Sequence, residues 1–279
     1  MKLDNIITKQ NYLTPSRYIS GRIVEYDIRS ANISVLRNSD IISQEDYEYL
    51  ASLPKILREK EIGLREKEDP TIYTSIQKGI KEAKKNLISF NQVETNQIIR
   101  IANDAVYINS NIDLEYRKFG EFIEFVPKSK YDVFCNLNNI IIFCKFDNNG
   151  NIHIDIKGIG DNIILHRDYM VYTIMSTIAL LERSGIEDAI DYLSEICRNY
   201  VNRNLPVGYY REFNSTSMYK TIYQTINMYP YGLTNVMESD KFDLDINYNY
   251  SILRELWSIL FEIYTIRKRW IFQWEIIKL

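Results

Sequence analysis

Two aspartates stand beside apolar runs, and their chemistry is the strongest functional signal in the chain. Asp27 lies at the end of segment 21–28, and Asp104 lies within segment 98–108. Neighbouring strands can bring two such carboxylates together around divalent cations, which stabilise the attacking and leaving oxygens of a phosphoryl transfer. The two residues therefore predict a site for Mg²⁺ or Mn²⁺ and a nucleotidyltransferase built around it.

The segments between these aspartates predict a strand followed by two helices. Residues 21–28 are rich in β-branched side chains and favour a strand. Ser43 is a predicted N-cap, and apolar residues at helical spacing continue from it to Leu64. Pro70 ends that pattern, because proline disfavours helical backbone in the residue before it. A second helix is predicted over residues 71–90.

The second helix has two distinct faces. One is an apolar stripe (Ile72, Ile76, Ile80, Ala83 and Leu87), and the other carries four lysines (Lys78, Lys81, Lys84 and Lys85). Two charged helices joined at a proline predict a protruding hairpin. The same charges also fit a pair of solvated surface helices.

The rest of the chain predicts strands and then helices. Strands are expected over 97–108 and 119–126, and a β-hairpin over 140–157 with its turn at 147–150. Helices are expected over three later segments: 167–183, 186–203 and 250–270. The composition changes near residue 160, which predicts two domains, residues 1–160 and residues 161–279.

Composition and charge are those of an ordinary folded protein. The 279 residues are 46% hydrophobic and 25% charged, with a net charge of −3 and three widely spaced cysteines. That cysteine spacing predicts a reducing compartment, and no window approaches the roughly 18 apolar residues of a membrane span. Abundant Tyr, Ile, Asn and Lys with few Gly and Pro indicate A/T-rich coding, as in a virus. We expect a cytoplasmic protein, in the host cytoplasm if it is viral, with no membrane contact.

Residues 27–34, Asp-Ile-Arg-Ser-Ala-Asn-Ile-Ser, resemble the first palm motif of family B DNA polymerases, DxxSLYPS. The aspartate and both serines are in register. The resemblance implies that Asp27 and Ile28 hold metal and that the backbone from Ser30 onward cradles the incoming triphosphate. Asn32 replaces the family's tyrosine that excludes a 2′-hydroxyl, so we hypothesise that ribose is not strongly rejected.

The helical hairpin carries a similar, weaker resemblance. Residues 53–58 resemble the first fingers helix of that family, and residues 85–90 are similar to its KxxxNSxYG motif, without the Tyr-Gly pair. The resemblance implies that Arg58, Lys81 and Lys85 neutralise phosphate charge as it develops in the transition state.

Residues 102–107, Ala-Asn-Asp-Ala-Val-Tyr, are similar to the DTDSV motif of the same family. The second aspartate, which holds metal in the family, is kept as Asp104, and the first is replaced by Ala102. Only 104 − 27 = 77 residues separate the two aspartates. The helix that normally lies between the second and third motifs is therefore expected to be missing.

Further matches follow in the family's order. Residues 149–158 resemble the hairpin that ends in a Lys-Gly pair before the thumb, and residues 166–169 resemble the RRDW start of the next helix. Residues 185–190 match the opening of another thumb helix. The resemblance spans about 21–205 and implies that Lys157 and Arg167 contact the template and primer.

Together these features predict an α+β fold, with a polymerase-like palm sheet, a two-helix fingers hairpin over about 43–90, and a helical thumb-like C-terminal region. The expected activity is that of a small DNA polymerase or primer-synthesising polymerase in DNA replication. Its expected partners are a nucleic acid primer-template, nucleoside triphosphates, and other replication proteins or a second polymerase fragment. Two alternatives stay open: an inactive palm-derived replication subunit or part of a split polymerase, and a viral structural or interaction protein of unrelated α+β fold.

Overall fold

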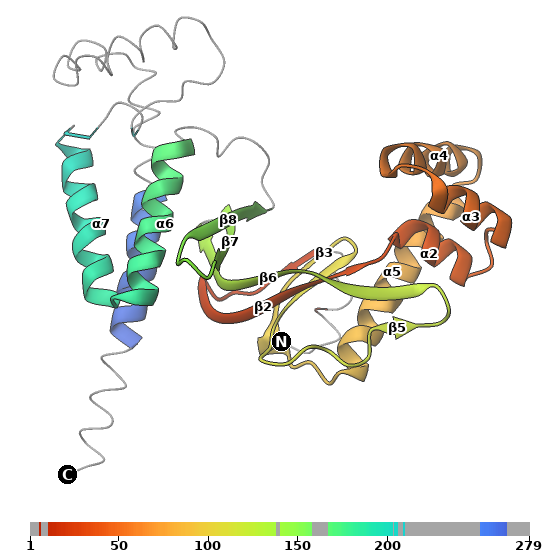
Figure 1. The fold of residues 1–279 in the computed structure, drawn as a ribbon, viewed down its shortest axis with the longest axis horizontal. Helices are drawn as coiled ribbons and strands as arrows, with labels where there is room; N and C mark the ends of the chain where they lie inside the picture. Colours follow the sequence, from red (N-terminus) through yellow and green to blue (C-terminus); the bar gives the residue numbers. More distant parts are fainter. Residues whose placement is uncertain are drawn as a thin grey trace, which may run out of the picture. The chain divides into compact units, whose positions relative to one another are not determined.

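The computed structural model describes residues 6, 11–137, 140–157, 167–202, 204–205, 209 and 252–266, apart from the side chains of 157 and 167–170. It confirms a mixed α+β fold (Figure 1). Contacts divide the chain into two compact units, Met1–Val133 and Phe134–Leu279. The division falls inside a long strand, whereas the composition placed a boundary near residue 160.

The first unit contains an antiparallel sheet with the strand order β1-β3-β4-β2-β6. These strands are β1 (Asn11–Leu13), β2 (Tyr18–Ile28), β3 (Ile98–Ala102), β4 (Ala105–Asn109) and β6 (Ile123–Leu137), with the short β5 (Lys118–Phe119) paired to β6. The strand predicted over 21–28 is confirmed as part of β2. The stretch predicted over 97–108 is a tight hairpin, because Asn103 and Asp104 form a turn between β3 and β4. The strand predicted over 119–126 is interrupted between β5 and β6.

Four helices accompany this sheet: α2 (Ala31–Asn38), α3 (Gln44–Ser52), α4 (Lys55–Glu68) and α5 (Thr71–Phe90). Ser43 is confirmed as an N-cap, since its hydroxyl accepts a hydrogen bond from the Asp46 N–H. The single helix expected from Ser43 to Leu64 was wrong. Pro54 forces Leu53 into extended backbone (ψ 144°) and so separates α3 from α4.

The break at Pro70 is confirmed, and α5 has the predicted bounds. Its apolar stripe is buried, as expected, from Ile72 to Leu87. Lys84 is the exception to the predicted polar face, because only 3% of it is exposed. In Figure 1, α2, α3 and α4 gather at one end of α5, and contacts join α2 to α3 and α5, and α4 to α3 and α5.

The second unit continues from β6 into a hairpin and helices. β7 (Ile140–Phe146) pairs antiparallel with β8 (Ile152–Lys157) across the predicted turn. The helices α6 (Arg167–Arg183) and α7 (Ile186–Val201) and a helix over 252–266 confirm the three predicted helical segments. His166 and Gly158, which belong to the resembling motifs, lie outside the described residues.

The packing of α2 on α5 depends on a glycine and yields a stability prediction. A Cβ on Gly79 would overlap Val35 Cγ1, on the buried side of α2. Gly79→Ala should lower the free energy of unfolding in urea by about 1–3 kcal/mol, because overpacking outweighs the gain in helix propensity.

Gly63→Ala is the matched control for that measurement. Gly63 lies in α4 with nothing within 4 Å of its added Cβ, so this substitution should stabilise the protein by about 0.5–1 kcal/mol. Equal effects of the two substitutions would contradict the close packing at Gly79.

Candidate functional site

The strand register brings the two aspartates together. Asp27, near the end of β2, pairs with Ala105 at the start of β4, so Asp104 in the preceding turn is adjacent to it. The Ile28 N–H donates a hydrogen bond to the Asp104 carbonyl oxygen (3.3 Å). Both aspartates are only partly exposed. Two carboxylates separated by 77 residues in sequence therefore share one end of the β2–β4 pair.

The turn that carries Asp104 is fixed from behind by Lys84. Asn103 has a φ of 48°, in the left-handed region that asparagine tolerates. The buried Lys84 Nζ, from α5, donates a hydrogen bond to the Asn103 carbonyl oxygen. Burial lowers the pKa of Lys84 to about 8, and the nearby Asp104 carboxylate opposes that shift. A cation thus lies directly beneath the acidic turn.

A cavity of about 200 Å³ opens in front of the two aspartates. Its walls come from β2, α2, α4 and the β3–β4 turn (Asp27, Ile28, Ser30, Ala31, Asn32, Ile33, Lys55, Arg58, Glu59, Ile62 and Asp104). Six residues singled out from the sequence are therefore gathered in one place. They come from the end of β2, the β3–β4 turn, the start of α2 and α4, so the fold rather than sequence proximity assembles them.

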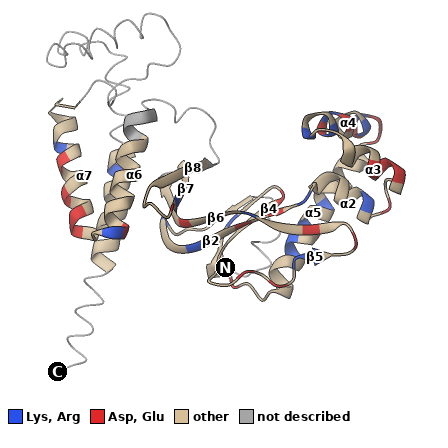
Figure 2. Cartoon of the chain, viewed as in Figure 1, with Lys and Arg blue, Asp and Glu red and all other residues tan. Residues whose placement is uncertain are grey.

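Other predicted site residues lie elsewhere or outside the described side chains. Lys81 and Lys85 are exposed on α5, among the basic residues visible along that helix in Figure 2, and neither lines the cavity. Lys157 is in β8 and Arg167 begins α6, but their side chains lie outside the described part of the structure.

The start of α2 adds backbone donors to this cavity. Ser30, the N-cap, has a φ of 48° and its side chain makes no capping hydrogen bond. The first N–H groups of a helix lack partners within the helix and favour negative charge. Both Ser30 and Asn32, in the first turn, line the cavity. Backbone in a sparsely populated region beside two acids is typical of a functional site.

Negative charge at the site is costly and is balanced by a second lysine. Burial raises the pKa of the Asp104 carboxyl, and the adjacent Asp27 charge raises it further. Lys128 Nζ, from β6, lies 2.8 Å from Asp27 Oδ2 and 3.7 Å from Glu25 Oε1. Its hydrogen bond to Asp27 raises the pKa of Lys128. The Lys128 ammonium and the carboxylates of Asp27 and Glu25 thus stabilise one another.

Two residues before Asp27 in β2, the buried Glu25 carboxylate has polar partners on neighbouring strands. Only 2% of Glu25 is exposed, and its carboxylate accepts a hydrogen bond from Tyr131 Oη (3.2 Å). Burial and the Glu25 charge raise the pKa of Tyr107, whose ring lies 5.8 Å from the Arg100 guanidinium. Glu25 lies opposite Tyr107 in the β2–β4 pair, so this group adds polar contacts between neighbouring strands.

Sequence reasoning missed Lys55, Lys84 and Lys128. Lys84 follows Ile76 and Ile80 at four-residue spacing, which was a signal that it belongs to the buried face. Lys128 has no comparable local signal, because its partner Asp27 lies 101 residues away. Lys55 lies one helical turn before Glu59 and pairs with it at 3.7 Å, so sequence suggests only a surface ion pair.

The donor set suits a hard divalent cation. Mg²⁺ is commonly held by one or two carboxylates together with substrate phosphates, rather than by a full protein cage. Two aspartates at one cavity match that pattern. Among the described residues, no group of three or more His, Cys, Asp and Glu side chains is placed to hold a metal.

Comparison with known proteins places the chain in a phage family. Residues 1–262 match the family model described as bacteriophage PBS1 gene 130 protein. The chain belongs to this family. No curated protein matches it. The viral origin expected from composition is therefore confirmed, while the family's description specifies no activity. No helix in the described segments is long and apolar enough to cross a membrane.

Because the pKa of Asp104 is raised, replacing its carboxyl group with a neutral amide should stabilise the folded protein. In the folded state the ionised carboxylate is disfavoured, so stability is lost as pH rises through the folded pKa. Asp104→Asn should therefore raise the free energy of unfolding at neutral pH in the presence of a chelator. That gain should shrink as the pH falls toward 3.8, the ordinary value for aspartate.

Asp27→Asn is the control in the same urea titrations. It removes the ion pair with Lys128 and should lower stability or leave it unchanged. A loss of stability in Asp104→Asn at neutral pH, equal to that in Asp27→Asn, would contradict the electrostatic account.

Proposed function

We propose that this chain is a template-directed nucleotidyltransferase of the polymerase type. The supporting observation is the cavity that joins Asp27 and Asp104 to Arg58 across from them. In this proposal the sheet that carries the acids is a palm and the α4–α5 hairpin is the fingers. The helices α6, α7 and 252–266 form a thumb-like region.

The two aspartates are the proposed catalytic carboxylates. Together with the Ile28 carbonyl, they would hold Mg²⁺ or Mn²⁺. Two such cations would stabilise the attacking and leaving oxygens of an in-line phosphoryl transfer. Lys84 holds the turn that presents Asp104, and Lys128 offsets the charge of Asp27. In this proposal the two lysines orient the turn and the strand end that carry the carboxylates.

The cavity walls contain the proposed triphosphate contacts. Arg58 and Lys55 of α4 supply positive charge, and the start of α2 supplies backbone donors from Ser30 onward. Fixed donors and cations aimed at developing charge stabilise phosphoryl-transfer transition states. Lys81 and Lys85, exposed on α5, are proposed to contact phosphate only through a movement of the hairpin.

Asn32 is the proposed sugar-recognition residue. It lines the cavity one helical position after Ala31, in the first turn of α2. Its side chain is small and polar and can hydrogen-bond to a hydroxyl. We therefore propose that both deoxyribose and ribose are accepted, which is compatible with primer synthesis.

The proposal includes partners and a place of action. The substrates are nucleoside triphosphates and a primer-template, with Lys157 and Arg167 as proposed contacts to the nucleic acid. Other replication proteins of the phage, or a second polymerase fragment, would act with it in the host cytoplasm.

One observation favours the alternative of an inactive palm-derived subunit. The Lys128 ammonium lies 2.8 Å from Asp27, where it neutralises the charge that would otherwise attract a metal ion. A site balanced by lysine is stable without metal. Such a subunit would keep the fold and serve a replication partner.

Primer extension tests the proposed activity. The purified protein, a labelled primer-template and Mg²⁺ or Mn²⁺ should give extended products in separate deoxy- and ribonucleotide reactions. Asp27→Asn and Asp104→Asn should each lower the rate by at least about a hundredfold, as expected when an electrostatic group at the reacting centre is lost.

Arg58→Ala and Lys60→Ala are a matched pair for the same assay. Arg58 lines the cavity, whereas Lys60 is exposed on α4 and does not. The first should raise the KM for nucleotide and the second should not. Absence of extension by folded wild-type protein would reject autonomous polymerase activity and favour the inactive subunit.

A further inference from the structure

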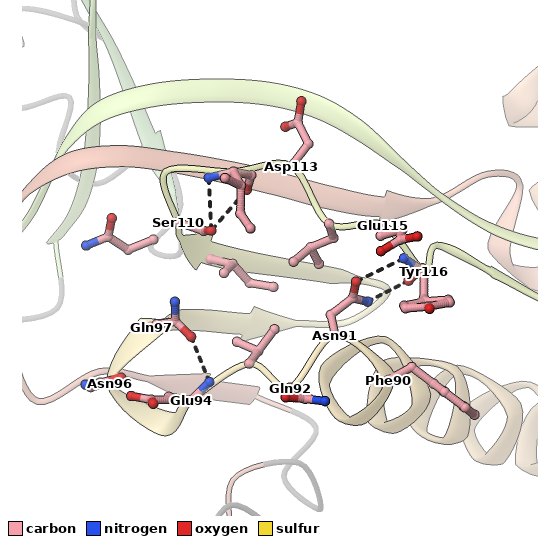
Figure 3. A pocket seen from close by; sticks show the side chains of 15 residues that line it. Phe90, Asn91, Gln92, Glu94, Asn96, Gln97, Ser110, Asp113, Glu115 and Tyr116 are labelled. Atoms are coloured by element: carbon pink, nitrogen blue, oxygen red, sulfur yellow. Dashed lines mark hydrogen bonds between the residues drawn. The ribbon is translucent and has the colours of Figure 1, made fainter.

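A larger cleft lies at the open end of the β3–β4 hairpin, and the turn with Asp104 is at the other end. Its volume is about 840 Å³, and two segments of the first unit line it, residues 90–97 and residues 108–116 (Figure 3). We propose that this cleft binds a lysine- or arginine-containing segment of a partner polypeptide. The inference does not depend on the proposed polymerase activity.

The wall formed by residues 110–116 is irregular in structure but held at several points. Asn91 Nδ2 donates a hydrogen bond to the Tyr116 carbonyl (2.6 Å), and Asn91 Oδ1 accepts one from the Tyr116 N–H (3.0 Å), as Figure 3 shows. The Leu114 N–H donates to Tyr26 Oη (3.0 Å), and Arg22 donates to the Ser110 carbonyl (2.8 Å). The cleft is therefore preformed, which lowers the entropic cost of binding.

The opposite wall is also fixed at its base. It consists of the end of α5 and the short 3₁₀ helix η1 (Thr95–Gln97), where Glu94 and Gln97 form a reciprocal cap. Val93 packs inward and is buried, whereas Gln92 and Asn96 are exposed along the rim. These exposed amides can donate to and accept from the backbone of an extended peptide.

Large apolar side chains are left in solvent at this cleft. The exposed fractions are 59% for Phe90, 74% for Ile112 and 53% for Tyr116. The rings of Phe90 and Tyr116 are close, with centroids 6.5 Å apart. Clustered exposed apolar groups with a polar rim mark interaction sites rather than ordinary surface. Such rings can pack against the aliphatic stem of a lysine or arginine.

The charged residues that line the cleft favour a positively charged ligand. Its charged side chains are Glu94, Asp113 and Glu115, and it includes no Lys, Arg or His. All three acids are exposed, but Asp113 is already paired with Arg22 and lies 3.7 Å from Lys130. Glu94 and Glu115 are therefore the carboxylates proposed to meet the ligand. These carboxylates repel phosphate, so nucleic acid is disfavoured. They attract a cation, which the adjacent ring faces also bind.

Fluorescence anisotropy of a labelled hexalysine peptide at low ionic strength tests this proposal. The 279-residue chain should bind the peptide. Glu115→Lys and Tyr116→Ala should each weaken binding by about fivefold or more, because the first replaces an attractive charge with a repulsive one and the second removes a cation–π contact. The backbone of Tyr116 keeps its bonds to Asn91 in the second variant, so the wall is preserved.

Glu187→Lys is the matched control, because Glu187 is an exposed acid in α7 of the second unit. Unchanged binding in this control, with weakened binding in both cleft variants, supports the proposal. The proposal is rejected if wild-type protein does not bind the peptide, or if the cleft variants bind it as wild type does. An equal loss in Glu187→Lys also rejects it, since general acidity would then explain the attraction.

Discussion

The pairing of β2 with β4 is the constraint on which the site depends. The register opposes Asp27 to Ala105, so the turn at Asn103 and Asp104 must close beside the end of β2. A shift by one residue would turn Asp27 to the other face of the sheet. The register is fixed by burial, because Val24, Tyr26, Val106 and Ile108 all belong to the core. Hydrophobic packing thus fixes the position of a polar pair.

The carboxylates of Asp27 and Asp104 need stabilising contacts from the surrounding residues. Two neighbouring carboxylates repel each other, and partial burial increases the cost. Two lysines offset this charge. Lys128 from β6 pairs with Asp27, and Lys84 from α5 donates a hydrogen bond to the turn that carries Asp104. Burial of the Lys84 ammonium is itself unfavourable, and its hydrogen bond to the Asn103 carbonyl and the nearby Asp104 charge offset part of that cost.

Local signals in the sequence predicted much of the fold. The Ser43 cap, the break at Pro70, the bounds of α5 and the hairpin around 147–150 each depend on a few neighbouring residues. Pro54 was misjudged because apolar spacing continued through it. The motifs singled out cavity residues on β2, the β3–β4 turn, α2 and α4, each from a short local pattern. Lys128 was missed because its partner is 101 residues distant, and no local pattern records such a contact.

Direct measurement of metal binding tests the central claim that Asp27 and Asp104 form one cation site. Bound Mn²⁺ loses its free-ion electron paramagnetic resonance signal, so titration of the protein gives the number and affinity of sites. Wild-type protein and Asp113→Asn, a change in an exposed acid elsewhere, should bind Mn²⁺ alike, while Asp27→Asn and Asp104→Asn should both lose the site. Mn²⁺ binding that survives both substitutions, or no binding by wild type, would contradict the account.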